Sequence, residues 1–121
     1  MQAIKVKIPG KIIKIPYLTF RGQTEGKTCV ISGGVHGDEV NGIQLVREFI
    51  EYARKHKIEK TLKGKIIILP IVNQKGFEKN SRFNPEDDKD INRNYNKKEK
   101  TASNLIANAL ERHFYSKADL A

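Results

Sequence analysis

The sequence predicts an α/β fold in which helices flank a central mixed, largely parallel sheet. Three observations lead to this prediction. Segments with the two-residue period of strands alternate along the chain with segments whose apolar residues recur at the helical spacing of three and four. Two of the strand-like segments are mostly apolar, as strands covered on both faces are. The length of 121 residues fits one domain at most.

Five segments have the composition of strands: residues 3–8, 11–15, 17–21, 28–32 and 65–72. The first two alternate in polarity around the turn-forming pair Pro9-Gly10, which predicts a hairpin. The last two are rich in β-branched residues, and we expect them to be buried strands. Residues 118–121 have the composition of the beginning of another strand.

Two segments have helical periodicity, residues 38–56 and residues 99–115. Between them, residues 73–98 are polar and lack periodicity over about 25 positions, a length at which loops are usually functional or disordered. Ligands in α/β sheets bind at the carboxyl ends of the strands. We therefore expect the turn at 33–39 and the loop at 73–96 to lie at the same edge of the sheet.

Composition restricts the classes of partner. The chain has 23 basic and 14 acidic residues, a formal net charge of +9, but the basic residues are dispersed and do not alternate with aromatic ones. We therefore expect no nucleic-acid partner. No segment has the apolar length of a membrane span or a signal peptide, so we expect no membrane partner. The single cysteine, Cys29, fits a reducing compartment, and we therefore expect a cytoplasmic location.

The segment SGGVHGDEVNG, residues 32–42, carries the first chemical motif. A buried strand leads into two glycines, His36 follows in a tight turn, and Glu39 opens the next helix. The spacing of three puts both side chains on one side of a strand-to-helix corner, and imidazole and carboxylate are good zinc ligands. The alternative is an ordinary helix N-terminus, in which Asp38 or Glu39 is a cap and His36 is a surface residue.

Three further motifs follow in the polar loop: Asn73-Gln74-Lys75-Gly76, then Arg82, then Asp90-Ile91-Asn92-Arg93-Asn94-Tyr95. Together with the His-x-x-Glu motif, and in this order, they resemble the zinc carboxypeptidase superfamily. Within it they are most similar to the succinylglutamate desuccinylase/aspartoacylase branch. The resemblance covers roughly residues 28–120, and it implies a zinc-carboxypeptidase-like fold.

The resemblance implies roles for five residues. His36 and Glu39 correspond to ligands of a single zinc ion, and Arg82 to a catalytic arginine that polarises the scissile carbonyl. Asn92 and Arg93 correspond to residues that bind the free carboxylate of the substrate, for which the planar guanidinium is suited. The alternative for both arginines is an exposed position in the loop without a catalytic role.

The chain departs from the family pattern in one respect. Catalytic zinc usually has three protein ligands, and the family's third ligand, a histidine, is expected beyond residue 121, as is the general base. Residues 1–121 are therefore interpreted as the amino-terminal part of a single zinc-hydrolase catalytic domain, a truncated fragment. We expect this fragment to have little activity, to bind zinc weakly, and to self-associate through an exposed sheet edge.

The expected activity is hydrolysis of the amide bond of a small N-acyl amino acid. The alternative within enzymes is a zinc carboxypeptidase that acts on peptides or cell-wall peptides, because either substrate has a free carboxylate. Two other classes, a basic nucleic-acid-binding module and a non-catalytic relative that keeps only the fold, are weaker hypotheses. The first would require a continuous basic face.

Overall fold

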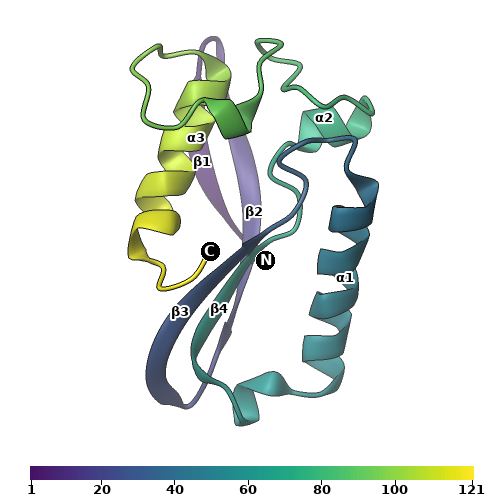
Figure 1. The fold of residues 1–121 in the computed structure, drawn as a ribbon, viewed down its shortest axis with the longest axis vertical. Helices are drawn as coiled ribbons and strands as arrows, with labels where there is room; N and C mark the ends of the chain where they lie inside the picture. Colours follow the sequence, from purple (N-terminus) through teal and green to yellow (C-terminus); the bar gives the residue numbers. More distant parts are fainter.

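A computed structural model describes all residues 1–121 (Figure 1). The strands are β1 (Gln2–Ile8), β2 (Lys11–Arg21), β3 (Thr24–Ser32) and β4 (Lys63–Leu69). The α-helices are α1 (Val40–Lys55), α2 (Gln74–Glu78) and α3 (Ala102–His113), and the 3₁₀ turns are η1 (Ile58–Lys60), η2 (Ile91–Arg93) and η3 (Tyr115–Lys117). The predicted α/β class is confirmed, since one sheet carries helices on both of its faces.

The four strands form one sheet in the order β1-β2-β4-β3. The pairs β1/β2 and β2/β4 are antiparallel, and only β3/β4 is parallel. The prediction of a largely parallel sheet is therefore wrong. The pairing is mostly antiparallel because a tight turn at Pro9-Gly10 can only join the first pair as an antiparallel hairpin. A parallel pair requires a long crossover, which α1 provides between β3 and β4. Only the β3-α1-β4 unit has such a crossover.

Strand β2 is continuous where two short strands were predicted. It passes through Pro16, which pairs with Ala3 of β1. Strand β4 pairs with β2 only from Leu18 onward. Pro16 therefore lies where β2 has a single strand neighbour, and a residue without an N–H donor is tolerated at such an edge position.

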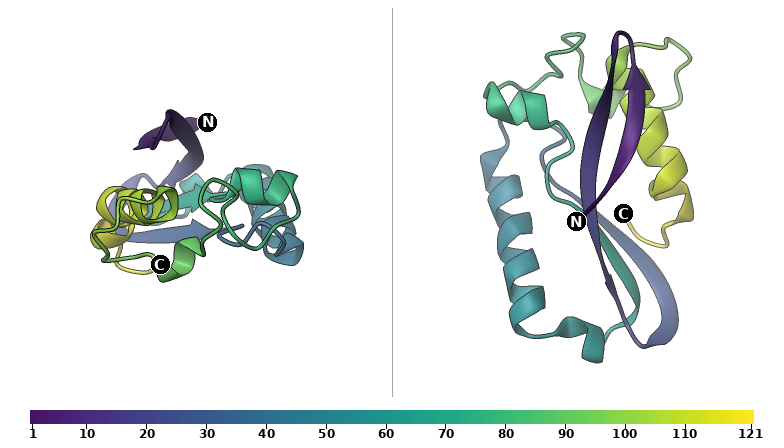
Figure 2. Two further views of the ribbon diagram at one scale, coloured as in Figure 1. Left: turned by 90° about the horizontal axis from the view of Figure 1, so that it is seen from above. Right: turned by 180° about the vertical axis from the view of Figure 1, so that it is seen from behind.

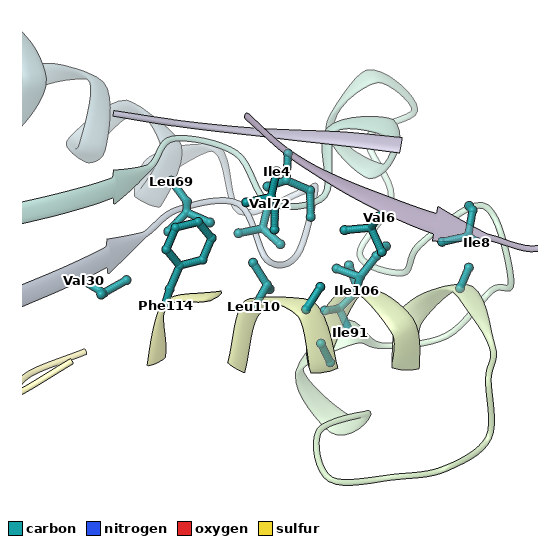
Figure 3. Packing of buried hydrophobic residues seen from close by; sticks show 14 residues of the cluster. Ile4, Val6, Ile8, Val30, Leu69, Val72, Ile91, Ile106, Leu110 and Phe114 are labelled. Atoms are coloured by element: carbon teal, nitrogen blue, oxygen red, sulfur yellow. The ribbon is translucent and has the colours of Figure 1, made fainter. Parts of the chain in front are cut away.

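The two long helices cover opposite faces of the sheet. On β4, Ile68 packs in the cluster that contains Val46 and Ile50 of α1, while the next residue, Leu69, packs in the cluster that contains Leu110 of α3. Figure 2 shows the β1–β2 hairpin beside α3. Figure 3 shows the inward-facing residues of β1 against the apolar side of α3. These residues are Ile4, Val6 and Ile8 on β1, and Ile106, Leu110 and Phe114 on α3.

The long polar segment at 73–98 is ordered by short elements that its sequence pattern does not show, α2 and η2. Near the end of the chain, Leu120 forms a parallel bridge with Cys29, and its carbonyl accepts the amide of Val30 at 2.8 Å. Part of the free edge of β3 is therefore paired. Self-association through a sheet edge stays a prediction. None of the helices is long and apolar enough to cross a membrane.

Candidate functional site

The candidate site is the corner between β3 and α1, which lies at the carboxyl ends of β3 and β4 (Figure 1). Backbone pairing continues past the two strands, because the amide of Gly33 donates to Leu69 and the amide of Asn73 donates to Gly34, at 2.9 and 2.8 Å. Gly34 has a φ of +59°, a conformation that side chains other than glycine rarely adopt. The corner is thus fixed to the start of the polar loop, as the sequence predicted.

The Asn-x-x-Gly motif has a structural role at this junction. The side chain of Asn73 caps α2 by accepting the amide of Gly76 at 2.9 Å, and its amide group donates to the carbonyl of Phe83 at 3.2 Å. The backbone of Gly76 lies directly against Gly37, where an added Cβ would overlap it. Asn73 therefore joins the corner, α2 and the segment around Phe83 into one unit.

His36 is the centre of the site. It is 8% exposed, and its two ring nitrogens contact two different carboxylates. Nδ1 lies 2.9 Å from Glu39 Oε1, and Nε2 lies 3.0 Å from Asp90 Oδ1. Glu39 precedes α1, but its side chain makes no capping bond, and the first turn of the helix contains no acidic residue. The alternative with a capped helix and a surface histidine is therefore wrong, because His36 is buried and Glu39 turns toward it.

Asp90 was not among the site residues predicted from the sequence. Its backbone and side chain are both held, since Oδ1 accepts the amide of Asn92 at 2.8 Å and the backbone carbonyl accepts the side chain of Asn94 at 2.6 Å. The signal that could have found Asp90 is its place at the start of the Asp-x-Asn-Arg motif. A histidine that binds a metal commonly uses its other nitrogen to contact a carboxylate.

The protonation of this cluster follows from its contacts. Burial alone would lower the pKa of His36, but the hydrogen bonds with Glu39 and Asp90 outweigh it, so the pKa is raised above its ordinary value of 6.5. Burial would likewise raise the pKa of Asp90, but the contact with His36 and the amide of Asn92 hold it below its ordinary 3.8. Both groups therefore favour their charged forms.

The two predicted arginines lie at the mouth of this cluster. Arg82 Nη1 is 3.7 Å from Glu39 Oε1, and Arg93 Nε is 3.9 Å from Asp90 Oδ2. The Arg93 side chain is 82% exposed and the Arg82 side chain 48% exposed. Asn92 is exposed beside them on η2. The fold thus brings all five predicted residues to one edge of the sheet, and both guanidinium groups remain accessible to an anion.

The donor set fits a zinc ion. If Nε2–H donates to Asp90, neutral His36 presents the lone pair of Nδ1 to a carboxylate oxygen of Glu39. The Nδ1 lone pair and the carboxylate oxygen repel each other unless a proton or a cation lies between them. Imidazole nitrogen and carboxylate oxygen are also atom types that zinc binds. Asp90 contacts the opposite ring nitrogen, so it has no access to the same ion. No three His, Cys, Asp or Glu side chains of the chain are arranged so that they could hold one metal ion together.

Comparison with known proteins gives a consistent result. The sequence model of the succinylglutamate desuccinylase/aspartoacylase catalytic domain matches residues 25–120. The chain is 31% identical over 90 residues to N-alpha-acetyl-L-2,4-diaminobutyric acid deacetylase from Halomonas elongata, a match that covers 74% of this chain and 23% of the deacetylase.

Two solved structures share the fold. An aspartoacylase family protein from Mesorhizobium loti superposes with a TM-score of 0.81 at 26% identity, and the product-bound ectoine utilization protein EutE (DoeB) from Ruegeria pomeroyi with 0.75 at 25%. Each match covers 98% of this chain and 37% of the other. The chain therefore spans well under half the length of each of these three relatives.

Proposed function

This chain belongs to the succinylglutamate desuccinylase/aspartoacylase family, and from that premise we propose that the whole protein is a zinc-dependent hydrolase that cleaves the amide bond of an N-acyl amino acid. The observation that carries the proposal is the meeting of Glu39, His36 and Asp90 at the carboxyl ends of β3 and β4. An imidazole held between two carboxylates, one of them on its far side, is the arrangement of a metal-binding histidine with its supporting acid.

In this proposal His36, through Nδ1, and Glu39 are the zinc ligands that this chain supplies. Zinc, when bound, lowers the pKa of a coordinated water and polarises a carbonyl, which is the chemistry that amide hydrolysis needs. Asp90 fixes the tautomer of His36 by accepting its Nε2–H. This contact also increases the basicity of the nitrogen that faces Glu39.

The arginines provide the substrate contacts. In support of a catalytic role for Arg82, its guanidinium lies near Glu39; we propose that it stabilises the negative charge that develops on the carbonyl oxygen during hydrolysis. Arg93 is more exposed and makes only a long contact with Asp90, which leaves its planar fork free to bind a carboxylate. Together with Asn92, it would select substrates with a free carboxylate, such as amino acid derivatives.

The remaining parts of the site belong to the rest of the proposed protein. A catalytic zinc site takes three protein ligands and a water, and residues 1–121 gather only His36 and Glu39 around one point. We propose that the third ligand and the general base lie outside these residues. The share of the relatives that the chain spans, 23% to 37%, agrees with this.

The test is the substitution His36→Ala in the whole protein, with zinc content and amine release from N-acetyl and N-succinyl amino acids as readouts. Removing only a supporting residue of a metal site typically costs 10-fold to 100-fold. Removing the ligand itself should therefore reduce activity by more than about 100-fold and abolish stoichiometric zinc. The matched control is His56→Ala, because His56 is exposed at the end of α1 and stacks only on Tyr52.

Wild-type zinc content and activity in the His36→Ala protein would refute the proposal and favour a non-catalytic relative. A wild-type enzyme that released carboxyl-terminal residues from peptides but left every N-acyl amino acid intact would replace the proposed substrate class by the carboxypeptidase alternative.

A further inference from the structure

Two polar residues are buried in the otherwise apolar side of α3. Ser103 is 0% exposed and Asn104 is 1% exposed. The other buried residues of the helix are apolar: Ala102, Ile106, Ala107, Ala109 and Leu110. Burying a hydroxyl and an amide costs free energy unless each finds partners. Their partners therefore show what these two residues do.

Ser103 holds the first half of the loop that carries the candidate site. Its backbone N–H and its hydroxyl donate to the two carboxylate oxygens of Asp87, at 2.6 and 2.7 Å. The same hydroxyl oxygen accepts the side-chain amide of the buried residue Asn84 at 3.2 Å. Hydrogen bonds to a carboxylate are stronger than neutral ones, so this half of the loop is fixed to the first turn of α3.

Asn104 holds the second half of the same loop. Its amide group donates to the backbone carbonyls of Asn94 and Lys97, at 2.8 and 2.9 Å, and its oxygen accepts the amide of Lys100 at 3.2 Å. Asn94 in turn donates its side-chain amide to the carbonyl of Asp90. A single side chain thereby connects α3 to the residue that contacts His36.

We propose that Ser103 and Asn104 are positioning residues of the candidate site. They fix residues 84–97 on both sides of Asp90, so that its carboxylate meets Nε2 of His36 and the neighbouring Asn92 and Arg93 are held at the same edge of the sheet. The inference concerns the loop and stands without the proposed function. Only its consequence for zinc binding and catalysis rests on that function.

The decisive comparison is between Asn104→Ala and Asn108→Ala in the whole protein. Both changes replace asparagine by alanine on the same helix, and both side chains donate to the carbonyl of Lys97, but only Asn104 also bonds to Asn94. The primary readout is amide hydrogen exchange at Asn92 and Asn94, with the amides of β4 as an internal reference for global stability.

Loss of three hydrogen bonds should accelerate exchange at Asn92 and Asn94 by at least about tenfold in Asn104→Ala relative to Asn108→Ala, while the β4 amides change much less. Equal protection of the loop in the two variants would overturn the proposal. So would an equal loss of protection in the loop and β4, because that outcome identifies Asn104 as a residue of general stability only.

Two further measurements complete the test. If Asn104→Ala does not fold, the milder pair Ser103→Ala and Ser116→Ala replaces it. Ser116→Ala is the control, since Ser116 is exposed and bonds only within its own turn. Loss of protection in the loop is expected for Ser103→Ala alone, and the absence of that loss contradicts the proposal. Zinc affinity in Asn104→Ala should fall about 10-fold. If amide exchange in the loop rises in Asn104→Ala but the whole protein binds no zinc even as wild type, the positioning role is supported and only the proposed function is refuted.

Discussion

Gly37 lies against the backbone of Gly76 with no space for a side chain between them. This contact joins the strand-to-helix corner that carries His36 to the backbone of α2 (Gln74–Glu78) itself. The two glycines come from different motifs of the sequence: a side chain at Gly37 would overlap the backbone of Gly76, and one at Gly76 would overlap the side chain of Asn73. The position of His36 relative to the loop depends on this close approach.

Gly37→Ala should therefore destabilise the protein and displace the corner. The added methyl group has to push two backbone segments apart, and overpacking of this kind typically costs about 1–3 kcal/mol. Urea unfolding monitored by circular dichroism measures the change. The control is Gly42→Ala in α1, where an added Cβ meets nothing within 4 Å. That change should stabilise the helix by about 0.5–1 kcal/mol, and a Gly37 variant that behaves in the same way would contradict the packing argument.

The pH dependence of stability in the metal-free protein should show a maximum at weakly acidic pH. Asp90 has a lowered pKa, so its contribution is present above 3.8 and is lost as the pH falls through the folded-state value. His36 has a raised pKa, so its contribution is present below 6.5 and is lost as the pH rises through the folded-state value. Both contributions are complete only between these two values.

The substitution Asp90→Asn tests this explanation, because it removes one of the two negative charges that face His36 and leaves the other, Glu39, in place. The free energy of unfolding, measured by urea titration over a series of pH values, should become flatter on both sides of the maximum. Asp38→Asn changes an exposed carboxylate of the same corner that forms no ion pair with His36, and should keep the wild-type profile. An Asp90 variant with an unchanged profile would show that the maximum has another origin.

Arg93→Ala should weaken substrate binding more than it slows the chemical step. A hydrogen-bonded charged contact is worth about 1.5–3 kcal/mol, so KM for an N-acyl amino acid should rise about 10-fold to 100-fold in the whole enzyme, with a smaller change in kcat. Steady-state kinetics separate the two constants. Arg47→Ala is the control, since Arg47 is 73% exposed on α1 and pairs only with Glu51. A fall in kcat at constant KM would move Arg93 from substrate binding to the chemical step.

The core beneath the loop can be tested with two leucines. Leu110 of α3 is 0% exposed, whereas Leu45 of α1 is 68% exposed. Leu110→Ala should cost about 2–5 kcal/mol through lost burial and a cavity, and Leu45→Ala less than about 0.5 kcal/mol. Thermal unfolding gives both values. Similar losses for the two leucines would mean that α1 buries Leu45 against another surface in solution.

Much of the fold was predictable because local patterns determine it. The alternation around Pro9-Gly10 produces the β1–β2 hairpin, and the apolar stripes of α1 and α3 appear in the sequence at the spacing of a helix. The direction of strand pairing was not predictable in the same way, since periodicity reports which face is buried but not which strand is the neighbour. The continuity of β2 across the predicted strands 11–15 and 17–21 was not predictable for a related reason, because tolerance of Pro16 within a strand depends on where β4 begins to pair.

The candidate site shows the same division. His36 and Glu39 are close in sequence, so the spacing of three was enough to pair them, and the family resemblance is confirmed by the match over residues 25–120. Asp90 meets His36 across 54 positions of sequence, and Ser103 meets Asp87 across 16. Contacts of this kind depend on how the loop folds, which no local pattern in residues 73–98 encodes.

The strand order has a consequence for the order of events during synthesis. Strand β3 leaves the ribosome before β4, yet β4 is its only strand partner in the sheet, and it also separates β3 from β2. The nascent chain therefore has to keep β3 unpaired until residue 69 has emerged, with α1 made in between. His36 follows β3 directly, so its surroundings assemble late, and an early misfolding step in this protein would be pairing of β3 with the finished β2 beside it.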